Sequence, residues 1–289
     1  MNELDAKTST GISGIPVVVL KEASMLIADP LVDIFKNCIS QNIFIREWKT
    51  AIVTPLYKSK GDVCDVNNYR GISVLPPLAK IFEKLLAARL KSYFETNNLL
   101  FHGQHGFRSA HSCETAIHEI VTSCFKNLDR KLINVLLFID FKKAFDMIDQ
   151  QLLLYKLLNY GLSNNALNLM KHYFTNRFQM TKINGIESNF VEIDLGVPQG
   201  SVLGPLLLII FINDLPFFLN DILTKLFADD TTLLFNGNTI VSVISSFKEG
   251  LRSLNEWCKH NRLHINWSKT FIMFITNKRL LTPAFIDYV

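Results

Sequence analysis

The chain has 289 residues, of which 48% are hydrophobic and 19% are charged. This balance excludes an intrinsically disordered protein and predicts a globular core, as one large domain or two modest ones. The net charge of +4 is compatible with nucleic-acid binding but does not establish it. The five cysteines include no Cys-x-x-Cys pair, so we expect reduced thiols in an intracellular protein and no zinc site.

We expect neither a signal peptide nor a membrane-spanning segment, and therefore no membrane partner. The most apolar stretch, residues 206–212, is too short to cross a bilayer. The sequence does not indicate an oligomeric state.

Several stretches carry apolar residues at helical spacing. The expected helices cover residues 26–45, 81–94, 112–128, 152–158, 163–173 and 241–261. In the last of them, the spacing predicts that Val241, Ile244, Phe247 and Leu254 face inward. The dipeptide Asn184-Gly185 between two strand-like runs predicts a β-hairpin.

A second hairpin is expected near the start of the chain, where residues 48–58 and 69–74 read as strands around a polar loop. Lys58, Lys60 and Arg70 could gather on this hairpin, and three cations there would suit the phosphates of a nucleotide. The alternative is a solvated loop, which we would favour if these residues stood alone.

An unbroken apolar run, residues 135–139, predicts a strand buried on both faces, and it ends at Asp140. A carboxylate in such a place must be paired, solvated or bound to a metal ion. The chain then turns helical, so Asp146 and Asp149 are carried away from Asp140 and we interpret them as structural.

Asp229 and Asp230 stand between the apolar runs 223–228 and 233–235, which predicts a hairpin with its acids at the tip. An exposed turn is the ordinary interpretation of such a doublet. However, adjacent carboxylates repel, so a folded protein keeps them for a cation or for strong hydrogen bonds. If Asp140 lies beside them, the three carboxylates could hold two Mg²⁺ ions for in-line phosphoryl transfer.

Two loops remain open to more than one interpretation. In residues 196–205, glycines and prolines allow the backbone to approach a ligand closely, and Gln199 could contact a base pair, sugar or phosphate. A tight loop before a core helix explains the same residues. In the polar loop 96–112, His105 and Arg108 could touch phosphate or template, although such residues more often serve the loop itself.

Taken together, these motifs resemble the reverse transcriptase domain of non-LTR (LINE-type, jockey-like) retrotransposons, from about Lys7 to Lys278. Residues 138–146 are similar to polymerase motif A, 196–205 to motif B, 227–230 to motif C and 266–270 to motif D. Residues 48–58, 68–76 and 104–108 resemble the fingers segments of the family. One departure is Gly71, which stands where the family usually has proline.

The resemblance implies an α+β fold, a right-hand polymerase palm with an antiparallel sheet and packed helices, plus fingers. Residues 1–134 would form the fingers and N-terminal segments. Residues 135–275 would form the palm, within which 196–215 contact the fingers. Residues 276–289 would be a truncated tail before a thumb that is largely missing.

The resemblance also implies roles for single residues. Asp140, Asp229 and Asp230 would be the catalytic metal ligands, and Lys269 would protonate the pyrophosphate leaving group. Phe145 would be the steric gate that rejects a 2′-hydroxyl. The implied dNTP-binding residues are Lys58, Lys60, Arg70, Phe141, Phe145, Gln199 and Gly200, and the implied template-primer residues are His105 and Arg108.

The function implied by the resemblance is RNA-directed DNA polymerase, a nucleotidyltransferase of a mobile element. It would use two Mg²⁺ ions, for which Mn²⁺ could substitute, with an RNA template, a DNA primer and dNTPs. The family leads us to expect the nucleus and cytoplasm as its location. The alternative is an inactive, truncated retrotransposon remnant with at most weak nucleic-acid binding.

Overall fold

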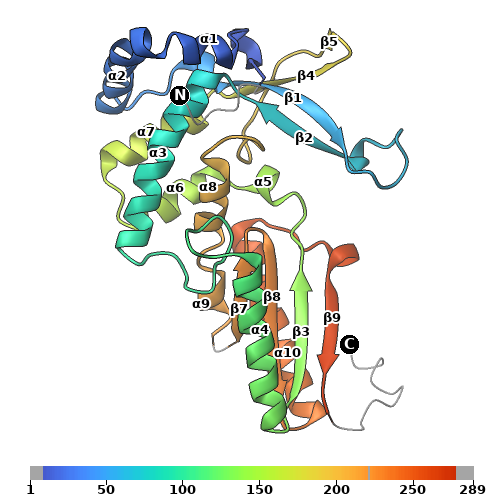
Figure 1. Cartoon of the computed structure of the whole chain (residues 1–289). Helices are drawn as coiled ribbons and strands as arrows, with labels where there is room; N and C mark the ends of the chain where they lie inside the picture. Colours follow the sequence, from blue (N-terminus) through green and yellow to red (C-terminus); the bar gives the residue numbers. More distant parts are fainter. Residues whose placement is uncertain (1–8, 221, 278–289) are drawn as a thin grey trace. The chain divides into compact units, whose positions relative to one another are not determined.

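The computed structural model describes residues 9–220 and 222–277 (Figure 1). The chain divides into two compact units, and each is built from separate stretches of sequence. Within the described residues, unit 1 comprises 9–99 and 148–207, and unit 2 comprises 100–147 and 208–277 except residue 221. The predicted tail 276–289 lies almost wholly outside the described residues.

Unit 1 combines helices with a mixed sheet. Its helices are α1 (Val17–Glu22), α2 (Ser24–Ser40), α3 (Pro77–Thr96), α6 (Gln150–Asn159) and α7 (Asn164–Phe174). Its strands are β1 (Thr50–Tyr57), β2 (Tyr69–Val74), β4 (Phe178–Ile183), β5 (Ile186–Glu187) and β6 (Val191–Glu192). Helix α8 (Gly204–Phe211) begins in unit 1 and continues into unit 2.

Both predicted hairpins of unit 1 are confirmed. Strands β1 and β2 pair antiparallel around the polar loop, and β4 and β5 pair around Asn184-Gly185, where both residues have positive φ. The sheet order is β2-β1-β4-β5, with β6 also paired to β4, and β1 runs parallel to β4. The aromatic core beside the sheet packs Phe35, Phe44, Trp48, Phe82 and Tyr173 together.

Unit 2 is built on a four-stranded antiparallel sheet of order β7-β8-β3-β9. Its strands are β3 (Ile133–Ile139), β7 (Leu223–Phe227), β8 (Asp230–Gly237) and β9 (Phe271–Ile275). Its helices are α4 (Cys113–Asp129), α5 (Ala144–Met147), α9 (Leu215–Phe218) and α10 (Ile240–Asn261). As predicted, β3 is a buried central strand, and Figure 1 shows α4 lying across its sheet.

The two long helices of unit 2 cover opposite faces of the sheet. Leu234 packs with Cys124 of α4, whereas the next residue, Phe235, packs against Phe247 of α10. Adjacent strand residues point to opposite faces, so α4 and α10 cannot share one. This cover explains why nearly all of β3 is apolar and buried.

The predicted inner face of α10 is wrong at its start. Val241 is 79% exposed and Val243 is buried instead, in line with Phe247, Gly250, Leu254 and Trp257. Gly250 explains the phase of the helix, because a Cβ there would lie 2.5 Å from the ring of Phe235. The helix therefore packs Gly250, rather than Val241, against β8.

Over the part of the chain that the structure describes, no helix combines the length and the apolar character needed to cross a membrane. The five cysteines are free thiols.

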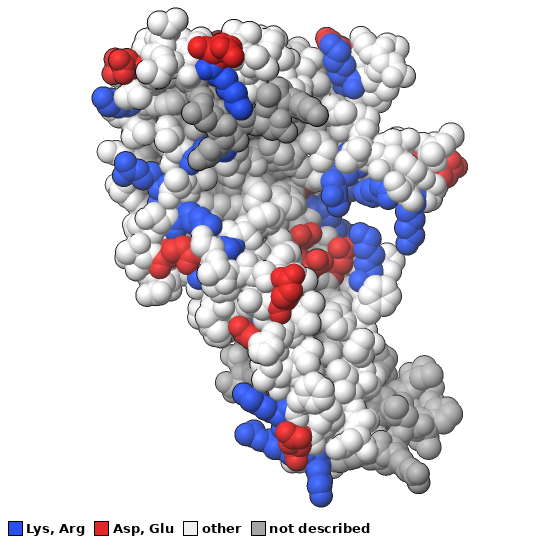
Figure 2. All heavy atoms as spheres, viewed as in Figure 1, with Lys and Arg blue, Asp and Glu red and all other residues white. Residues whose placement is uncertain are grey.

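On the face drawn in Figure 2, basic and acidic side chains are interspersed, so the modest positive charge does not form one continuous basic field there.

Candidate active site

The two acids of the doublet lie at the hairpin predicted from the sequence. Phe227 pairs with Asp230, so Ala228 and Asp229 form the two-residue turn between β7 and β8. Asp230 is the first residue of β8. Ala228 has φ of +55°, a left-handed conformation that a residue with a Cβ seldom adopts.

Asp140 reaches the same edge of the sheet. It directly follows β3, in which Ile139 pairs with Thr231 of β8. One further step along this antiparallel ladder places Asp140 beside Asp230. The structure therefore brings together, within unit 2, the carboxylates that the sequence analysis singled out.

The charges of these carboxylates interact. The pKa of Asp230 is raised above its usual value, first by burial and then by the nearby carboxylates of Asp229 and Asp140. Lys269 acts in the opposite direction and lowers the pKa of Asp230. Burial and the repulsion from two neighbouring carboxylates thus act together on Asp230, and Lys269 offsets only part of their effect.

One oxygen of Asp140 is held by neighbouring residues. Asn266 Nδ2 donates to Asp140 Oδ2 at 2.7 Å, and the Asn266 backbone N–H donates to the Asp140 carbonyl at 2.8 Å. Ser268 Oγ donates to Asn266 Oδ1 at 2.7 Å, which orients the amide. Lys269 Nζ lies 3.5 Å from the same Asp140 oxygen. Asn266 belongs to the motif D segment, yet the sequence analysis gave it no role.

The fit of a divalent cation can be judged from these donors. Within the described residues, no group of three or more His, Cys, Asp or Glu side chains is arranged as a metal-binding cluster. Carboxylates at a strand end and a turn are nevertheless the donors that suit Mg²⁺, which is commonly held by one or two carboxylates together with phosphate oxygens and water. The repulsion that Asp229 and Asp140 exert on Asp230 agrees with this donor set.

The two phenylalanines after Asp140 have different environments. Phe141 is 2% exposed and its ring packs against Trp257, with centroids 5.8 Å apart. Phe145 lies in the short helix α5 and is half-buried. Of the pair, only Phe145 therefore presents ring surface to a ligand.

The predicted template residues lie in the segment before α4. His105 is 2% exposed, and its Nδ1 is 2.8 Å from Thr115 Oγ1. Burial lowers the pKa of His105, despite the opposing charge of Glu119. Arg108 Nη1 donates to the Phe101 carbonyl at 3.0 Å. Both side chains thus make contacts within their own unit.

The predicted phosphate-binding residues belong to unit 1. Arg70 pairs with Leu56 across the β1–β2 ladder, so it shares a face with Lys58, which follows β1 by one residue. Lys58 Nζ donates to the Asn67 carbonyl in the hairpin loop at 2.8 Å. Lys60 lies in the same loop and is exposed. Lys58 and Arg70 therefore share one face of the hairpin, and Lys60 lies in its loop.

The loop that carries Gln199 and Gly200 is held closely against β2. The Ser73 backbone N–H donates to the Gln199 carbonyl at 2.6 Å. Gly200 has φ of +120°, and a Cβ there would lie 2.5 Å from the Ser73 carbonyl oxygen. This position therefore requires glycine for two independent reasons.

A buried carboxylate that the sequence analysis missed supports the same loop. Glu83 of α3 is fully buried, and its Oε2 accepts from the backbone N–H of Val202 at 2.6 Å and of Leu203 at 3.3 Å. Two cations of unit 1 interact with its charge, the buried Arg177 and Lys80. From the sequence, Glu83 reads as one polar residue on an amphipathic helix.

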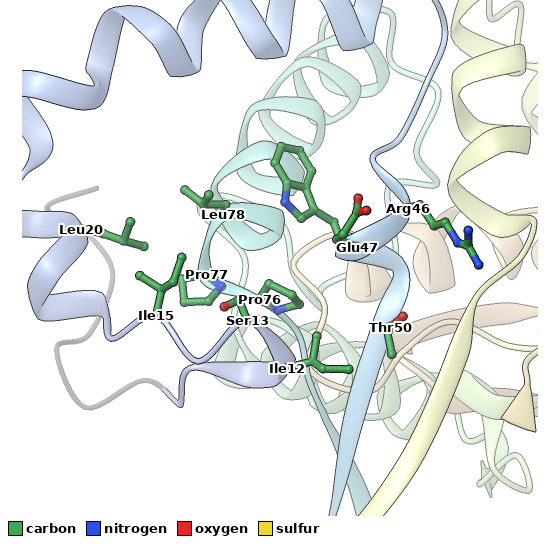
Figure 3. A pocket seen from close by; sticks show the side chains of 11 residues that line it. Ile12, Ser13, Ile15, Leu20, Arg46, Glu47, Thr50, Pro76, Pro77 and Leu78 are labelled. Carbon is green, nitrogen blue, oxygen red and sulfur yellow. The ribbon is translucent and has the colours of Figure 1, made fainter. Parts of the chain in front are cut away.

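A pocket of about 510 Å³ also lies in unit 1 (Figure 3). Its lining is mainly apolar and includes Ile12, Ile15, Leu20 and Leu78. None of the predicted catalytic, nucleotide-binding or template residues lines it. The pocket therefore does not mark the carboxylate site.

An antiparallel sheet with an aspartate at a central strand end beside an Asp-Asp turn defines the palm of a polymerase. Solved structures agree with this fold. An apo telomerase from Candida tropicalis has a TM-score of 0.58 at 13% identity, covering 83% of this chain and 53% of that chain. A telomerase from Candida albicans has a TM-score of 0.59 at 15% identity, covering 81% and 44%.

The family follows from sequence comparison. Residues 57–282 match the family described as "Reverse transcriptase (RNA-dependent DNA polymerase)", so the chain belongs to that family. It is 30% identical over 258 residues to the RNA-directed DNA polymerase from mobile element jockey of Drosophila melanogaster, covering 87% of this chain. It is 31% identical over 254 residues to the corresponding Drosophila funebris protein, covering 86% of this chain.

The chain spans about 28% of the length of each of these two relatives. The predicted resemblance to jockey-like non-LTR elements is confirmed, as is the α+β palm fold. Membership of this family implies dependence on a divalent metal ion.

Proposed function

We propose that this chain forms the catalytic core of an RNA-directed DNA polymerase of a mobile element, adding dNTPs to a primer 3′-hydroxyl on an RNA template. Family membership supports the reaction class. The observation that carries the proposal is the placement of Asp140 beside Asp230 and the Asp229 turn. The proposed location, as for the family, is the nucleus and cytoplasm.

Asp140, Asp229 and Asp230 would hold two Mg²⁺ ions, with Mn²⁺ as a substitute. When bound, the ions supply charge neutralisation of the triphosphate and activation of the primer hydroxyl. Asn266 keeps Oδ2 of Asp140 turned toward itself, which leaves Oδ1 as the oxygen of Asp140 for a ligand. The 3.5 Å separation between Lys269 Nζ and Asp140 Oδ2 supports the proposal that Lys269 protonates the departing pyrophosphate.

The remaining roles concern the nucleotide and the duplex. Lys60 and Arg70 bind the triphosphate, and Lys58 substitutes if the loop changes conformation. Phe145 excludes a 2′-hydroxyl, and Phe141, whose ring is buried, contributes to the nucleotide site through its backbone. Gln199 and Gly200 line the nascent base pair.

For the template-primer, we keep Arg108, which is half-buried, as a contact. We assign no direct contact between His105 and the template-primer, because its ring is buried and hydrogen-bonded to the Thr115 hydroxyl. Most of the affinity for nucleic acid comes from phosphates, so binding weakens as the salt concentration rises.

The test is primer extension on an RNA template with Mg²⁺ and dNTPs, comparing the wild type with Asp229→Asn. The substitution removes a negative charge from the turn of Ala228 and Asp229, which we call the carboxylate turn. We therefore expect it to abolish extension without unfolding the protein. Asp194→Asn, at an exposed aspartate of unit 1, is the matched control and should extend normally. Chelation should stop extension, and added Mg²⁺ or Mn²⁺ should restore it.

Extension that survives in Asp229→Asn would remove Asp229 from the proposed site. Absence of extension by the folded wild type would favour the alternative, an inactive retrotransposon remnant. Extension with ribonucleotides in place of dNTPs would instead indicate an RNA polymerase.

A further inference from the structure

The segment Phe101–Arg108 runs alongside β7 and adds to the edge of the unit 2 sheet. The Leu226 N–H donates to the Gly103 carbonyl at 2.9 Å, and the His105 N–H donates to the Leu226 carbonyl at 2.7 Å. Gln104 and Leu226 form a parallel bridge. The segment is therefore attached to the strand that leads directly into the carboxylate turn.

The side chain of Gln104, in the middle of this segment, contacts Ala228 in the carboxylate turn. Gln104 is 0% exposed, and its Oε1 accepts from the Ala228 N–H at 3.2 Å and from the Gly106 N–H at 2.8 Å. Ala228 immediately precedes Asp229 and has the left-handed φ described above. A disfavoured backbone conformation persists only where surrounding contacts enforce it, and Gln104 supplies such a contact.

Gly106 brings the backbone of the segment against the same turn. A Cβ at Gly106 would lie 2.2 Å from the Ala228 nitrogen, so no larger residue fits without displacing the turn. Gln104 and Gly106 thus contact Ala228 from one short loop, the first through a side-chain oxygen and the second through its backbone.

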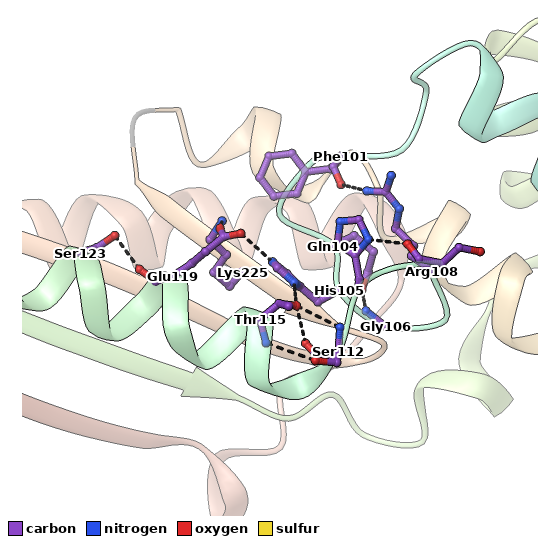
Figure 4. Close-up of polar contacts among 12 residues, drawn as sticks. Phe101, Gln104, His105, Gly106, Arg108, Ser112, Thr115, Glu119, Ser123 and Lys225 are labelled. Carbon is purple, nitrogen blue, oxygen red and sulfur yellow. Dashed lines mark hydrogen bonds and ion pairs between the residues drawn. The ribbon is translucent and has the colours of Figure 1, made fainter.

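The other side chains of the segment hold the loop in place (Figure 4). His105 contacts Thr115, which also forms a capping box with Ser112 at the start of α4. Arg108 closes the segment onto the Phe101 carbonyl. Glu119 of α4 forms an ion pair with Lys225 of β7. The loop is therefore anchored to both α4 and β7, which gives Gln104 a rigid base.

We propose that Gln104 is a positioning residue for the carboxylate turn: by accepting from the Ala228 N–H, it sets the backbone conformation that orients Asp229 and Asp230. The effect of this contact on catalysis rests on the proposed function; the contact itself does not. Gln104 thereby acquires a role in supporting the site, beside the contact with template-primer proposed for Arg108.

The test replaces Gln104 by methionine, which has similar length and no strong acceptor. We expect three effects: faster hydrogen exchange at the Ala228 amide, weaker Mn²⁺ binding measured by electron paramagnetic resonance without substrate, and a turnover lower by about 10- to 100-fold with the KM for dNTP little changed. The exchange and Mn²⁺ measurements do not depend on polymerase activity.

The matched control is Asn134→Leu. Asn134 is another fully buried amide of unit 2 and lies at the opposite end of β3 from Asp140. Its side chain accepts a hydrogen bond from Asn127 Nδ2 and donates one to the Cys124 carbonyl. It should lower the stability of unit 2 while leaving Ala228 exchange and Mn²⁺ binding as in the wild type. Equal effects of the two substitutions on Ala228 exchange would overturn the proposal, as would unchanged exchange in Gln104→Met.

A second variant covers the case in which Gln104→Met does not fold. Gln104→Glu keeps an acceptor oxygen of the same reach, so the folded variant should retain slow exchange at Ala228, and loss of that protection would refute the contact. If the wild type extends no primer, the proposed function fails, while the exchange measurements still decide whether Gln104 holds the turn.

Discussion

Two loops that carry predicted site residues are each held by one buried side chain from an earlier part of the chain. In unit 1, the carboxylate of Glu83 accepts from the N–H groups of Val202 and Leu203. In unit 2, the amide of Gln104 accepts from those of Gly106 and Ala228. Each of these two side chains, here called anchors, accepts hydrogen bonds from two backbone N–H groups, but Glu83 is an acid and Gln104 is a neutral amide.

The charge has consequences for the surroundings of each anchor. A carboxylate makes stronger hydrogen bonds to backbone N–H groups than a neutral amide does, but once buried it requires opposite charge nearby. Burial raises the pKa of Glu83, and Arg177 opposes this shift. Gln104 needs no countercharge. Because it contacts the turn of Asp229, a negative charge there would add to the repulsion that already raises the pKa of Asp230.

The largest effect should follow from breaking the charged anchor. Glu83→Leu leaves two backbone N–H groups without an acceptor and removes the charge that compensates Arg177, whose Nε and Nη2 have no hydrogen-bond partner among the described residues. We expect the free energy of unfolding to fall by about 3–5 kcal/mol. Urea denaturation measures it, and Gln104→Met should cost less, about 1–3 kcal/mol.

The double variant Glu83→Leu/Arg177→Leu sharpens this comparison. Removing the cation together with the carboxylate should recover part of the lost stability, because no unpaired charge then remains. If the double variant is less stable than Glu83→Leu by the full cost of Arg177→Leu alone, the two charges are not coupled.

Gly200, in the loop that Glu83 holds, and Gly106, in the segment that carries Gln104, both lie against backbone atoms, and these two positions should differ in a smaller way. At Gly200 an added Cβ would lie 2.5 Å from the Ser73 carbonyl oxygen, and the residue would also have to adopt φ of +120°. At Gly106 an added Cβ would only clash, at 2.2 Å from the Ala228 nitrogen. We expect Gly200→Ala to cost about 2–4 kcal/mol and Gly106→Ala about 1–3 kcal/mol. Thermal or urea unfolding measures both.

Gly185→Ala is the control for backbone strain without crowding. Gly185 has φ of +83° and no atom within 4 Å of an added Cβ. It should cost about 1–2 kcal/mol. A loss at Gly200 no larger than that at Gly185 would contradict the close contact with Ser73.

The smallest effect concerns pH. Burial and the charge of Arg177 lower the pKa of Lys49 from 10.5 to about 8. Between these values the unfolded chain binds more protons at Lys49 than the folded chain does, so the contribution of Lys49 to the free energy of unfolding should rise with pH from about 8 toward 10.5. Urea denaturation across this window measures the slope.

Lys49→Met should remove this part of the slope, whereas Lys182→Met, at a lysine paired with Glu187 on the surface, should leave it in place. Gln104→Met should not change it either, because an amide does not titrate. An unchanged slope in Lys49→Met would show that another group titrates in this range.

The features predicted from the sequence are those that depend on neighbouring residues. The apolar run before Asp140, the doublet at 229–230 and the Asn184-Gly185 turn all define their own local structure, and the structure contains each of them. Four motifs in order sufficed for the family because each contributes a chemically distinctive pattern.

The features that the sequence did not reveal depend on distant contacts. Glu83 is separated by 119 residues from Val202, and Gln104 by 124 residues from Ala228. Nothing near either residue in sequence indicates burial, so both read as ordinary polar positions. The sequence left His105 between a contact with template and a role within its own loop, and its burial beside Thr115 of α4 depends on the fold. The start of the inner face of α10 was predicted wrongly, because the close packing of Gly250 against Phe235 of β8 determines which side of the helix faces the sheet.

The central place of β3 in its sheet has a consequence for synthesis on the ribosome. Strand β3 ends at Ile139 and pairs with β8, which starts at Asp230, and with β9, which starts later still. At about 5 to 20 residues per second, the first partner strand follows only after roughly 5 to 20 s. During this interval the apolar strand has emerged without a partner, so it is exposed to aggregation unless a chaperone covers it.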